Sequence, residues 1–174
     1  MPTHTKPRHR IALISTGGTV EKTYDELAGV LKNEVSVLEV MLGSIQLGAV
    51  AVERVALMNK DSLEMTPEDH DLIARTALHK ASEVDGVVIV HGTDRLATTG
   101  DRIYSMNSKP PVPIVLTGAM RPYVMRTSDA LQNLTESLLA VQLADPGVYV
   151  AMHNKLLAFP GVSKDTERGT FVRL

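Results

Sequence analysis

The chain of 174 residues contains no cysteine. The fold therefore uses no disulfide, no zinc site with cysteine ligands and no thiol nucleophile. An excess of charge of one sign is also missing, because 18 Lys and Arg residues stand against 20 Asp and Glu residues, for a net charge of −2. Without a basic stripe that could follow a phosphate backbone, nucleic acid is not an expected partner.

Long hydrophobic runs are missing as well. The first apolar run, Ile11–Ile14, follows a basic and polar segment, residues 1–10, and ends before Ser15. Such a run is too short for a secretory signal or a membrane span, so we expect a cytoplasmic protein with no membrane partner. We expect residues 1–10 to form a flexible arm and residues 11–174 to form one domain with a substantial core.

Strand-like and helix-like segments alternate along the chain. Apolar runs predict strands at residues 11–14, 50–58, 87–90, 114–118 and 148–152. Amphipathic segments predict helices at residues 35–42, 95–107 and 127–143, and a further helix that begins after Thr66 and stops at Asp85–Gly86. This alternation predicts an α/β fold with an open, mostly parallel sheet and helices on both faces. Ligands of such sheets bind beyond the carboxyl ends of the strands.

Two adjacent glycines, Gly17 and Gly18, follow the first predicted strand in the sequence STGGTV. They are compatible with a tight turn and nothing more. They do not have the spacing of a dinucleotide fingerprint, and no lysine follows as in a phosphate loop. The functional interpretation is that the glycines expose the backbone to a small substrate, while Thr19 presents its hydroxyl to it.

Further polar clusters follow two later strands. Thr93 and Asp94 come directly after Gly92 in VIVHGTD, and VLTGAMRP contains Thr117 at the end of the next strand. Helix capping would account for Asp94 alone. His91 has no second histidine or acid at ligand spacing, so we expect neither a metal ion nor another cofactor.

The motifs TGGTV, HGTD and TGAMRP, in this order, resemble those of the bacterial-type L-asparaginases, the amidohydrolases with two active-site threonines. The resemblance runs from about Ile11 to about Lys164. It is to the N-terminal domain only, so the chain is similar to short members that lack the smaller C-terminal domain.

The resemblance implies roles for individual residues. Thr19 matches the nucleophile, Tyr24 its partner, and Lys164 in VSKD the catalytic lysine; Thr93 and Asp94 match the second threonine and its acid. The implied substrate-binding residues, which include the serine that binds the substrate carboxylate, are Gly18, Asp61, Ser62, Gly92, Thr93, Asp94 and Thr117. Leu63 departs from the pattern, because many members have glutamine there.

Amide hydrolysis needs a nucleophile, a proton acceptor, a site for the oxyanion and a proton for the departing ammonia. Backbone N–H groups near Gly92 and Thr93 are the expected oxyanion donors. Lys164 can act as a base only when it is neutral, whereas Asp94 favours its ammonium form. We therefore expect this pair to orient groups and relay protons together. Attack by Thr19 to form an acyl-enzyme and direct attack by water held at Thr93 both remain open.

The implied reaction is hydrolysis of L-asparagine to L-aspartate and ammonia. The alternatives are hydrolysis of glutamine or another small amide, and a non-catalytic domain that senses an amino acid. The absent second domain would leave apolar faces to be covered, so we expect a homo-oligomer, either a dimer or a tetramer. It would also remove an acid that reaches the substrate amine, which predicts weak substrate affinity.

Overall fold

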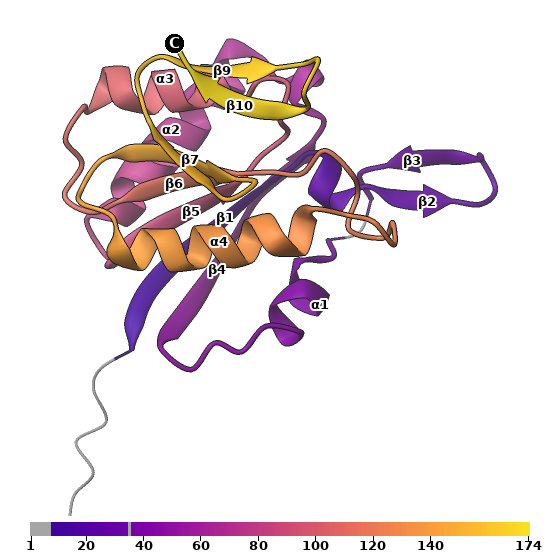
Figure 1. Ribbon diagram of the computed structural model, residues 1–174, viewed down its shortest axis with the longest axis horizontal. Coiled ribbons are helices and arrows are strands. Elements are labelled where there is room, and N and C mark those ends of the chain that lie inside the picture. The colour runs from indigo at the N-terminus through magenta and orange to yellow at the C-terminus, as the bar shows by residue number, and fades with distance from the viewer. Residues whose placement is uncertain (1–7, 35) are drawn as a thin grey trace, which may run out of the picture.

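A computed structural model describes residues 8–34 and 36–174 (Figure 1). Its main sheet has six strands, of which five run parallel and the last, β8, runs antiparallel to its neighbour. This confirms the predicted mostly parallel sheet. In spatial order the strands are β4 (Val50–Lys60), β1 (His9–Gly17), β5 (Gly86–Val90), β6 (Ile114–Thr117), β7 (Val148–Met152) and β8 (Lys155–Ala158).

Helices cover both faces of this sheet, as the sequence predicts (Figure 1). One face carries α2 (Pro67–Ala81) and α3 (Leu96–Met106), and the other carries α1 (Leu38–Gly43) and α4 (Ala130–Leu143). Alternate side chains of β1 enter the two cores: Ile14 packs with the α2 and α3 side, and Leu13 with the α1 and α4 side. Strands buried on both faces account for the continuous apolar runs of the sequence.

The helix boundaries differ from the predictions at several ends. Thr66 caps α2 as predicted, in a capping box with Asp69, and Pro67 is the first helical residue. The helix ends at Ala81, before the predicted stop. Helix α4 begins at Ala130, three residues later than predicted, because the Asp129 carboxylate accepts hydrogen bonds from the backbone of an earlier loop.

The N-terminal boundaries also need correction. Strand β1 begins at His9, whose N–H donates to the Ala49 carbonyl, so the predicted arm of residues 1–10 overlaps the strand. Residues 1–7 of that arm lie outside the described part of the chain. Helix α1 begins at Leu38, later than the predicted start at Val35, which also lies outside the described residues.

Two short hairpins were not predicted, because their strands of three or four residues show no clear periodicity. Strands β2 (Thr23–Asp25) and β3 (Val30–Lys32) form an arm that projects from the body (Figure 1). Strands β9 (Val162–Asp165) and β10 (Thr170–Arg173) lie over the α3 side of the sheet. No helix in the described residues is long and apolar enough to cross a membrane.

Candidate active site

The loop that follows β1 lies against the loop that follows β5. Gly17 and Gly18 have φ angles of +101° and +76°, in the region that favours glycine. A Cβ atom added to Gly18 would lie 2.4 Å from the backbone nitrogen of Gly92. The glycine pair therefore allows two backbones to touch, and this contact joins the first sequence motif to the second.

Two more segments converge on the β5 loop. A Cβ atom on Gly92 would lie 2.6 Å from Ser62 Oγ, which also accepts a hydrogen bond from the Arg95 N–H at 3.3 Å. A Cβ atom on Gly118 would lie 2.5 Å from the His91 carbonyl oxygen and 3.0 Å from Thr93 Cγ2. Segments far apart in the sequence thus meet at the carboxyl ends of neighbouring parallel strands, as the fold class predicts.

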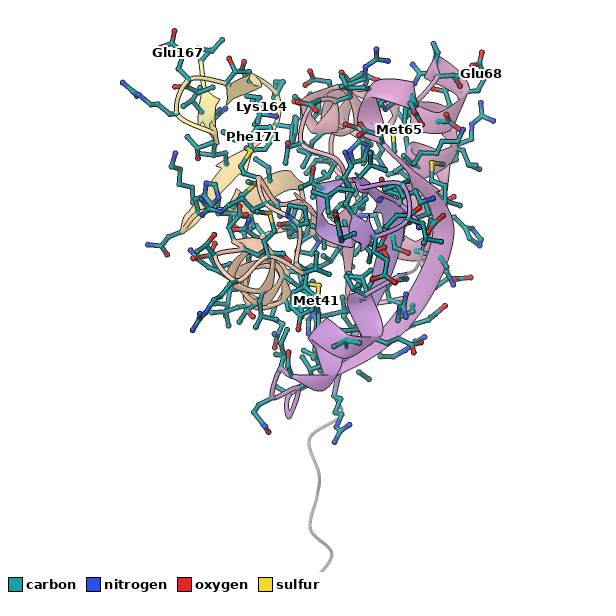
Figure 2. All side chains as sticks on the ribbon, turned by 90° about the vertical axis from the view of Figure 1, so that its right-hand side faces the viewer. Met41, Met65, Glu68, Lys164, Glu167 and Phe171 are labelled. Carbon is teal, nitrogen blue, oxygen red and sulfur yellow. The ribbon has the colours of Figure 1, made fainter. Side chains whose placement is uncertain are left out.

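Lys164 reaches the same place from the β9–β10 hairpin. Its Nζ donates hydrogen bonds to Thr93 Oγ1 at 2.9 Å and to Asp94 Oδ1 at 2.6 Å. Phe171 pairs with Lys164 across the hairpin and is buried in the core, which anchors the strand that carries the lysine (Figure 2). The Lys164 ammonium therefore contacts both the Thr93 hydroxyl and the Asp94 carboxylate, and we call these three residues the triad.

The contact with Lys164 changes the interpretation of Asp94. The N-cap residue of α3 is Arg95, and no side-chain hydrogen bond caps this helix. Asp94 therefore serves as the acceptor for Lys164 and not as a helix cap. Thr93 is 5% exposed, whereas the side chain of Asp94 is 44% exposed, so the triad extends from the buried loop to solvent.

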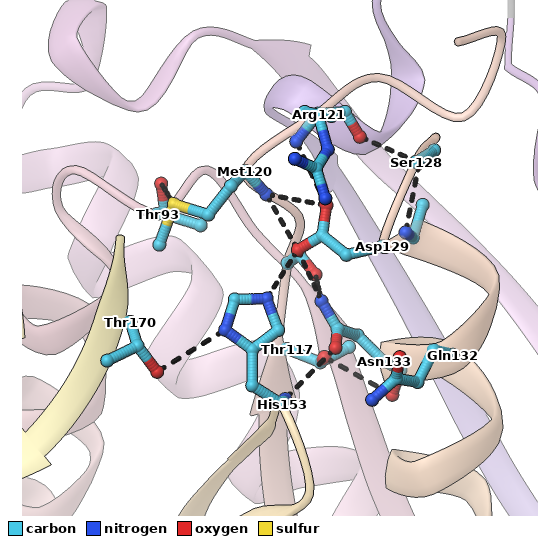
Figure 3. Close-up of polar contacts among 12 residues, drawn as sticks. Thr93, Thr117, Met120, Arg121, Ser128, Asp129, Gln132, Asn133, His153 and Thr170 are labelled. Atoms are coloured by element: carbon cyan, nitrogen blue, oxygen red, sulfur yellow. Dashed lines mark hydrogen bonds and ion pairs between the residues drawn. The ribbon is translucent and has the colours of Figure 1, made fainter. Parts of the chain in front are cut away.

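The TGAMRP loop is held by a buried acid that is not among the expected site residues (Figure 3). Asp129 accepts hydrogen bonds from the N–H groups of Met120 and Arg121, and His153 Nε2 donates to it at 2.7 Å. Burial alone would raise the pKa of Asp129, but these hydrogen bonds outweigh it and the pKa is lowered. Thr93 Oγ1 in turn lies 3.8 Å from Met120 Sδ, so this support extends to the triad.

The surroundings of Thr19 are more open. Thr19 begins the short 3-10 helix η1 (Thr19–Glu21), is partly exposed, and its hydroxyl has no hydrogen-bond partner in the described part of the chain. Asn33 donates to the Gly18 carbonyl at 2.8 Å and ties this loop to the end of the β2–β3 hairpin. Tyr24 lies on that hairpin, 64% exposed, and forms no hydrogen bond with Thr19. The structure therefore does not bring the expected pair together.

Two of the expected substrate-binding residues are engaged within the protein. Asp61 Oδ2 accepts a hydrogen bond from Lys22 Nζ at 2.6 Å, and this ion pair holds the pKa of Asp61 below its ordinary value. Thr117 is 1% exposed and donates to the Ala151 carbonyl at 2.8 Å, which links β6 to β7. Neither contact supports a role in substrate binding. No group of three or more His, Cys, Asp or Glu residues that could hold a metal ion occurs in the described ranges.

Comparison with known proteins identifies the family of this chain. The sequence matches the family described as "Asparaginase, N-terminal" over residues 10–170. The chain belongs to the asparaginase family. Members with similar sequence include the L-asparaginase of Thermococcus kodakarensis, which is 34% identical over 155 residues that cover 89% of this chain and 47% of the relative. The sequence-based identification of the family is therefore confirmed.

Other similar proteins carry a different name. A glutamyl-tRNA(Gln) amidotransferase subunit of Methanobrevibacter smithii is 36% identical over 88% of this chain and 35% of its own length. Among solved structures, the thermostable L-asparaginase of T. kodakarensis superposes with a TM-score of 0.85 at 33% identity, covering 95% of this chain and 51% of that one. The chain thus spans about half the length, or less, of the relatives it matches.

Proposed function

We propose that this asparaginase-family chain hydrolyses L-asparagine to L-aspartate and ammonia. The observation that carries the proposal is the position of Lys164 Nζ, in hydrogen-bond contact with both Thr93 Oγ1 and Asp94 Oδ1. A domain that only binds an amino acid has no need of an ammonium held against a buried hydroxyl. Such a triad suits proton transfer during the cleavage of an amide.

In the proposed reaction Thr19 Oγ1 attacks the side-chain carboxamide carbon and the C–N bond breaks. The Lys164 ammonium gives a proton to the leaving nitrogen, which departs as ammonia, and the proton of Thr19 passes through Thr93 to Lys164 and restores the ammonium. We assign this relay to Thr93 and Lys164, because they are hydrogen-bonded to each other beside the Gly18–Gly92 contact, whereas Tyr24 is 64% exposed on the hairpin. Water then attacks the ester, its proton returns to the threonine oxygen, and aspartate is released.

The Gly92–Thr93 backbone is the proposed oxyanion site. This peptide is supported by the close packing of Gly18 and Ser62 on Gly92. Loss of one oxyanion donor typically lowers kcat by about 10²- to 10³-fold. Ser62, 1% exposed beside the same loop, is the proposed group for the substrate α-carboxylate.

Ammonia release from L-asparagine tests this function directly. The acyl-enzyme route predicts a covalent adduct on Thr19, visible by intact mass after rapid quenching, and a Thr19→Ala variant without turnover. Normal turnover of Thr19→Ala, together with an inactive Thr93→Val variant, would instead support attack by water held at Thr93. Absence of ammonia from the wild-type protein, with tight amino-acid binding, would support the sensing domain.

A second candidate substrate is a glutamine amide. It is supported by the similarity to the glutamyl-tRNA(Gln) amidotransferase of M. smithii, whereas the net charge of −2 gives no support to a tRNA-bound form. One methylene in a pocket changes binding by only about 1–3 kcal/mol, so the two amides must be compared by turnover. The ratio of kcat/KM for L-asparagine and L-glutamine, measured on the same preparation, decides between them.

A homo-oligomer and a cytoplasmic location remain predictions. Support for an interface comes from leucines that α4 and β8 leave exposed, namely Leu139, Leu143 and Leu156. Sedimentation equilibrium over a range of protein concentrations measures the assembly state. A monomer at all concentrations would contradict the predicted oligomer.

A further inference from the structure

A buried chain of hydrogen bonds runs behind the β5 loop and joins three side chains that the proposed reaction does not use. His70 on α2 lies with Nδ1 2.6 Å from Thr99 Oγ1 on α3, and Thr99 Oγ1 lies 2.7 Å from His91 Nε2. His91 Nδ1 lies 2.7 Å from the Gly92 carbonyl oxygen. Thr99 and His91 are completely buried and His70 is 5% exposed, so water cannot replace these contacts.

The chemistry of the chain determines where each proton lies. A carbonyl oxygen can only accept, so His91 Nδ1 carries a proton and donates to Gly92. Burial lowers the pKa of His91 to about 4, so the ring is neutral at neutral pH and its Nε2 accepts from the Thr99 hydroxyl. The hydroxyl has one proton, so towards His70 it can only accept. His70 therefore also carries its proton on Nδ1.

The acceptor at the end of this chain belongs to the peptide at the centre of the site. The Gly92 carbonyl and the Thr93 N–H are opposite ends of one planar peptide unit, so a hydrogen bond that fixes the oxygen also fixes the direction of the N–H. Gly92 has no side chain that could restrain this peptide, and glycine gives the backbone wide freedom. Gly18 and Ser62 pack on Gly92, and the hydrogen bond from His91 restrains the carbonyl itself.

We propose that His91 is a positioning residue: it holds the Gly92–Thr93 peptide so that the Thr93 N–H points at the substrate oxyanion. His70 and Thr99 hold the His91 ring in the tautomer that makes this possible. The inference rests on the proposed amide hydrolysis, because the oxyanion is formed in that reaction. None of the three side chains touches substrate, and their effect passes through one peptide unit.

The tautomers can be measured without any turnover. In protein labelled with ¹⁵N-histidine, long-range ¹H–¹⁵N spectra at neutral pH distinguish a protonated ring nitrogen from an unprotonated one. We expect both His70 and His91 to be neutral with the proton on Nδ1, although free histidine favours Nε2. A proton on Nε2 of His91 would overturn the inference, whatever the activity of the protein.

Substitution of Thr99 tests the effect on catalysis. Thr99→Val removes the hydroxyl with little change in shape, and we expect kcat to fall about tenfold or more while KM stays within about twofold. Thr99→Ser, which keeps the hydroxyl, is expected to restore most of kcat. Thr98→Val is the matched control, because Thr98 is the neighbouring threonine and is exposed.

The outcomes separate this inference from the proposed function. Equal kcat values for the folded Thr99→Val and wild-type proteins would reject the positioning role and leave amide hydrolysis intact. A wild-type protein that releases no ammonia from either amide would reject the proposed function and, with it, the catalytic part of this inference. If Thr99→Val does not fold, His91→Asn takes its place, since its amide nitrogen can still donate to Gly92 and is expected to retain more kcat than His91→Leu.

Discussion

The two threonine loops of the site are held to very different degrees. After β5, Thr93 is buried, receives a hydrogen bond from Lys164, and belongs to a peptide whose carbonyl is held by His91. After β1, Thr19 is partly exposed and its hydroxyl has no hydrogen-bond partner in the described residues. The loop after β1 is shaped by its glycines, whereas the loop after β5 is held by side chains from α2, α3 and β9.

The difference does not come from the sheet order, because β1 lies between β4 and β5 just as β5 lies between β1 and β6. It comes from the segments that reach each loop: Lys164 of β9 and Ser62, which follows β4, both contact the loop after β5. The loop after β1 instead continues into the projecting β2–β3 hairpin. Groups that stabilise developing charge work best when they are fixed before the reaction, and the β5 loop provides such groups. The proposed nucleophile lies on the less restrained side.

The largest expected effect comes from removing the Lys164 ammonium, which β9 brings to the β5 loop. Lys164→Met should lower kcat for asparagine hydrolysis on the order of 10³-fold, because Thr93 and Asp94 lose their shared donor. Ammonia release measures the effect, and circular dichroism checks the fold. Lys109→Met, at an exposed lysine that precedes the amino end of β6, should leave kcat unchanged. Equal losses in both variants would contradict the role of the triad.

The contact between the loop after β1 and the loop after β5 can be disrupted by adding one carbon atom, the Cβ, at Gly18. Gly18→Ala should lower the free energy of unfolding by about 4 kcal/mol, because alanine is strained at φ +76° and its Cβ would meet Gly92. Gly29→Ala is the matched control: φ is +67° there, but nothing lies within 4 Å, so about 1 kcal/mol is expected. Urea unfolding of both variants gives the comparison. Equal losses would mean that the loops are not in contact.

The buried histidine behind the β5 loop predicts a pH dependence of stability. The pKa of His91 is about 4 in the folded protein, below the ordinary value of 6.5. At a pH between these two values, His91 is protonated in the unfolded chain and neutral in the folded chain. Stability should therefore be complete above pH 6.5 and fall by about 3 kcal/mol as the pH drops to 4. Urea unfolding across this range measures the slope, which His91→Asn should reduce. An unchanged slope in the variant would show that His91 is not buried in the neutral form.

The smallest effect is expected at Tyr24, on strand β2 after the Thr19 loop. Tyr24→Phe should change the free energy of unfolding by less than about 0.5 kcal/mol, because the side chain is 64% exposed and makes no hydrogen bond with Thr19. For the same reason kcat should fall by less than tenfold. A loss of about 100-fold or more would mean that the hairpin brings Tyr24 to Thr19 during turnover. The Thr19 hydroxyl would then have a hydrogen-bond partner during turnover, as the Thr93 hydroxyl has in Lys164.

Much of the fold could be predicted from local patterns. The buried strands and the start of α2 at Thr66 follow from apolar runs and from a capping sequence that needs no distant partner. The short strands β2, β3, β8, β9 and β10 were not predicted, since three or four residues carry too little pattern. Helix α4 starts late because Asp129 is held by backbone groups of residues 120 and 121, a contact outside any local window.

The sequence by itself determined the order of strands and helices, the glycine pair after β1 and the residues of the family motifs. The family resemblance implied that Lys164 and Asp94 act together, and the tertiary structure gives the contacts of Lys164 with Thr93 and Asp94. Only the tertiary structure decided that Asp61 is paired with Lys22 and that Tyr24 is exposed on β2. The physical reason is that the spatial order of the strands, β4-β1-β5-β6-β7-β8, differs from their order along the chain. Residues 70 positions apart meet because that order places strand ends side by side, and no local pattern encodes which ends will be neighbours.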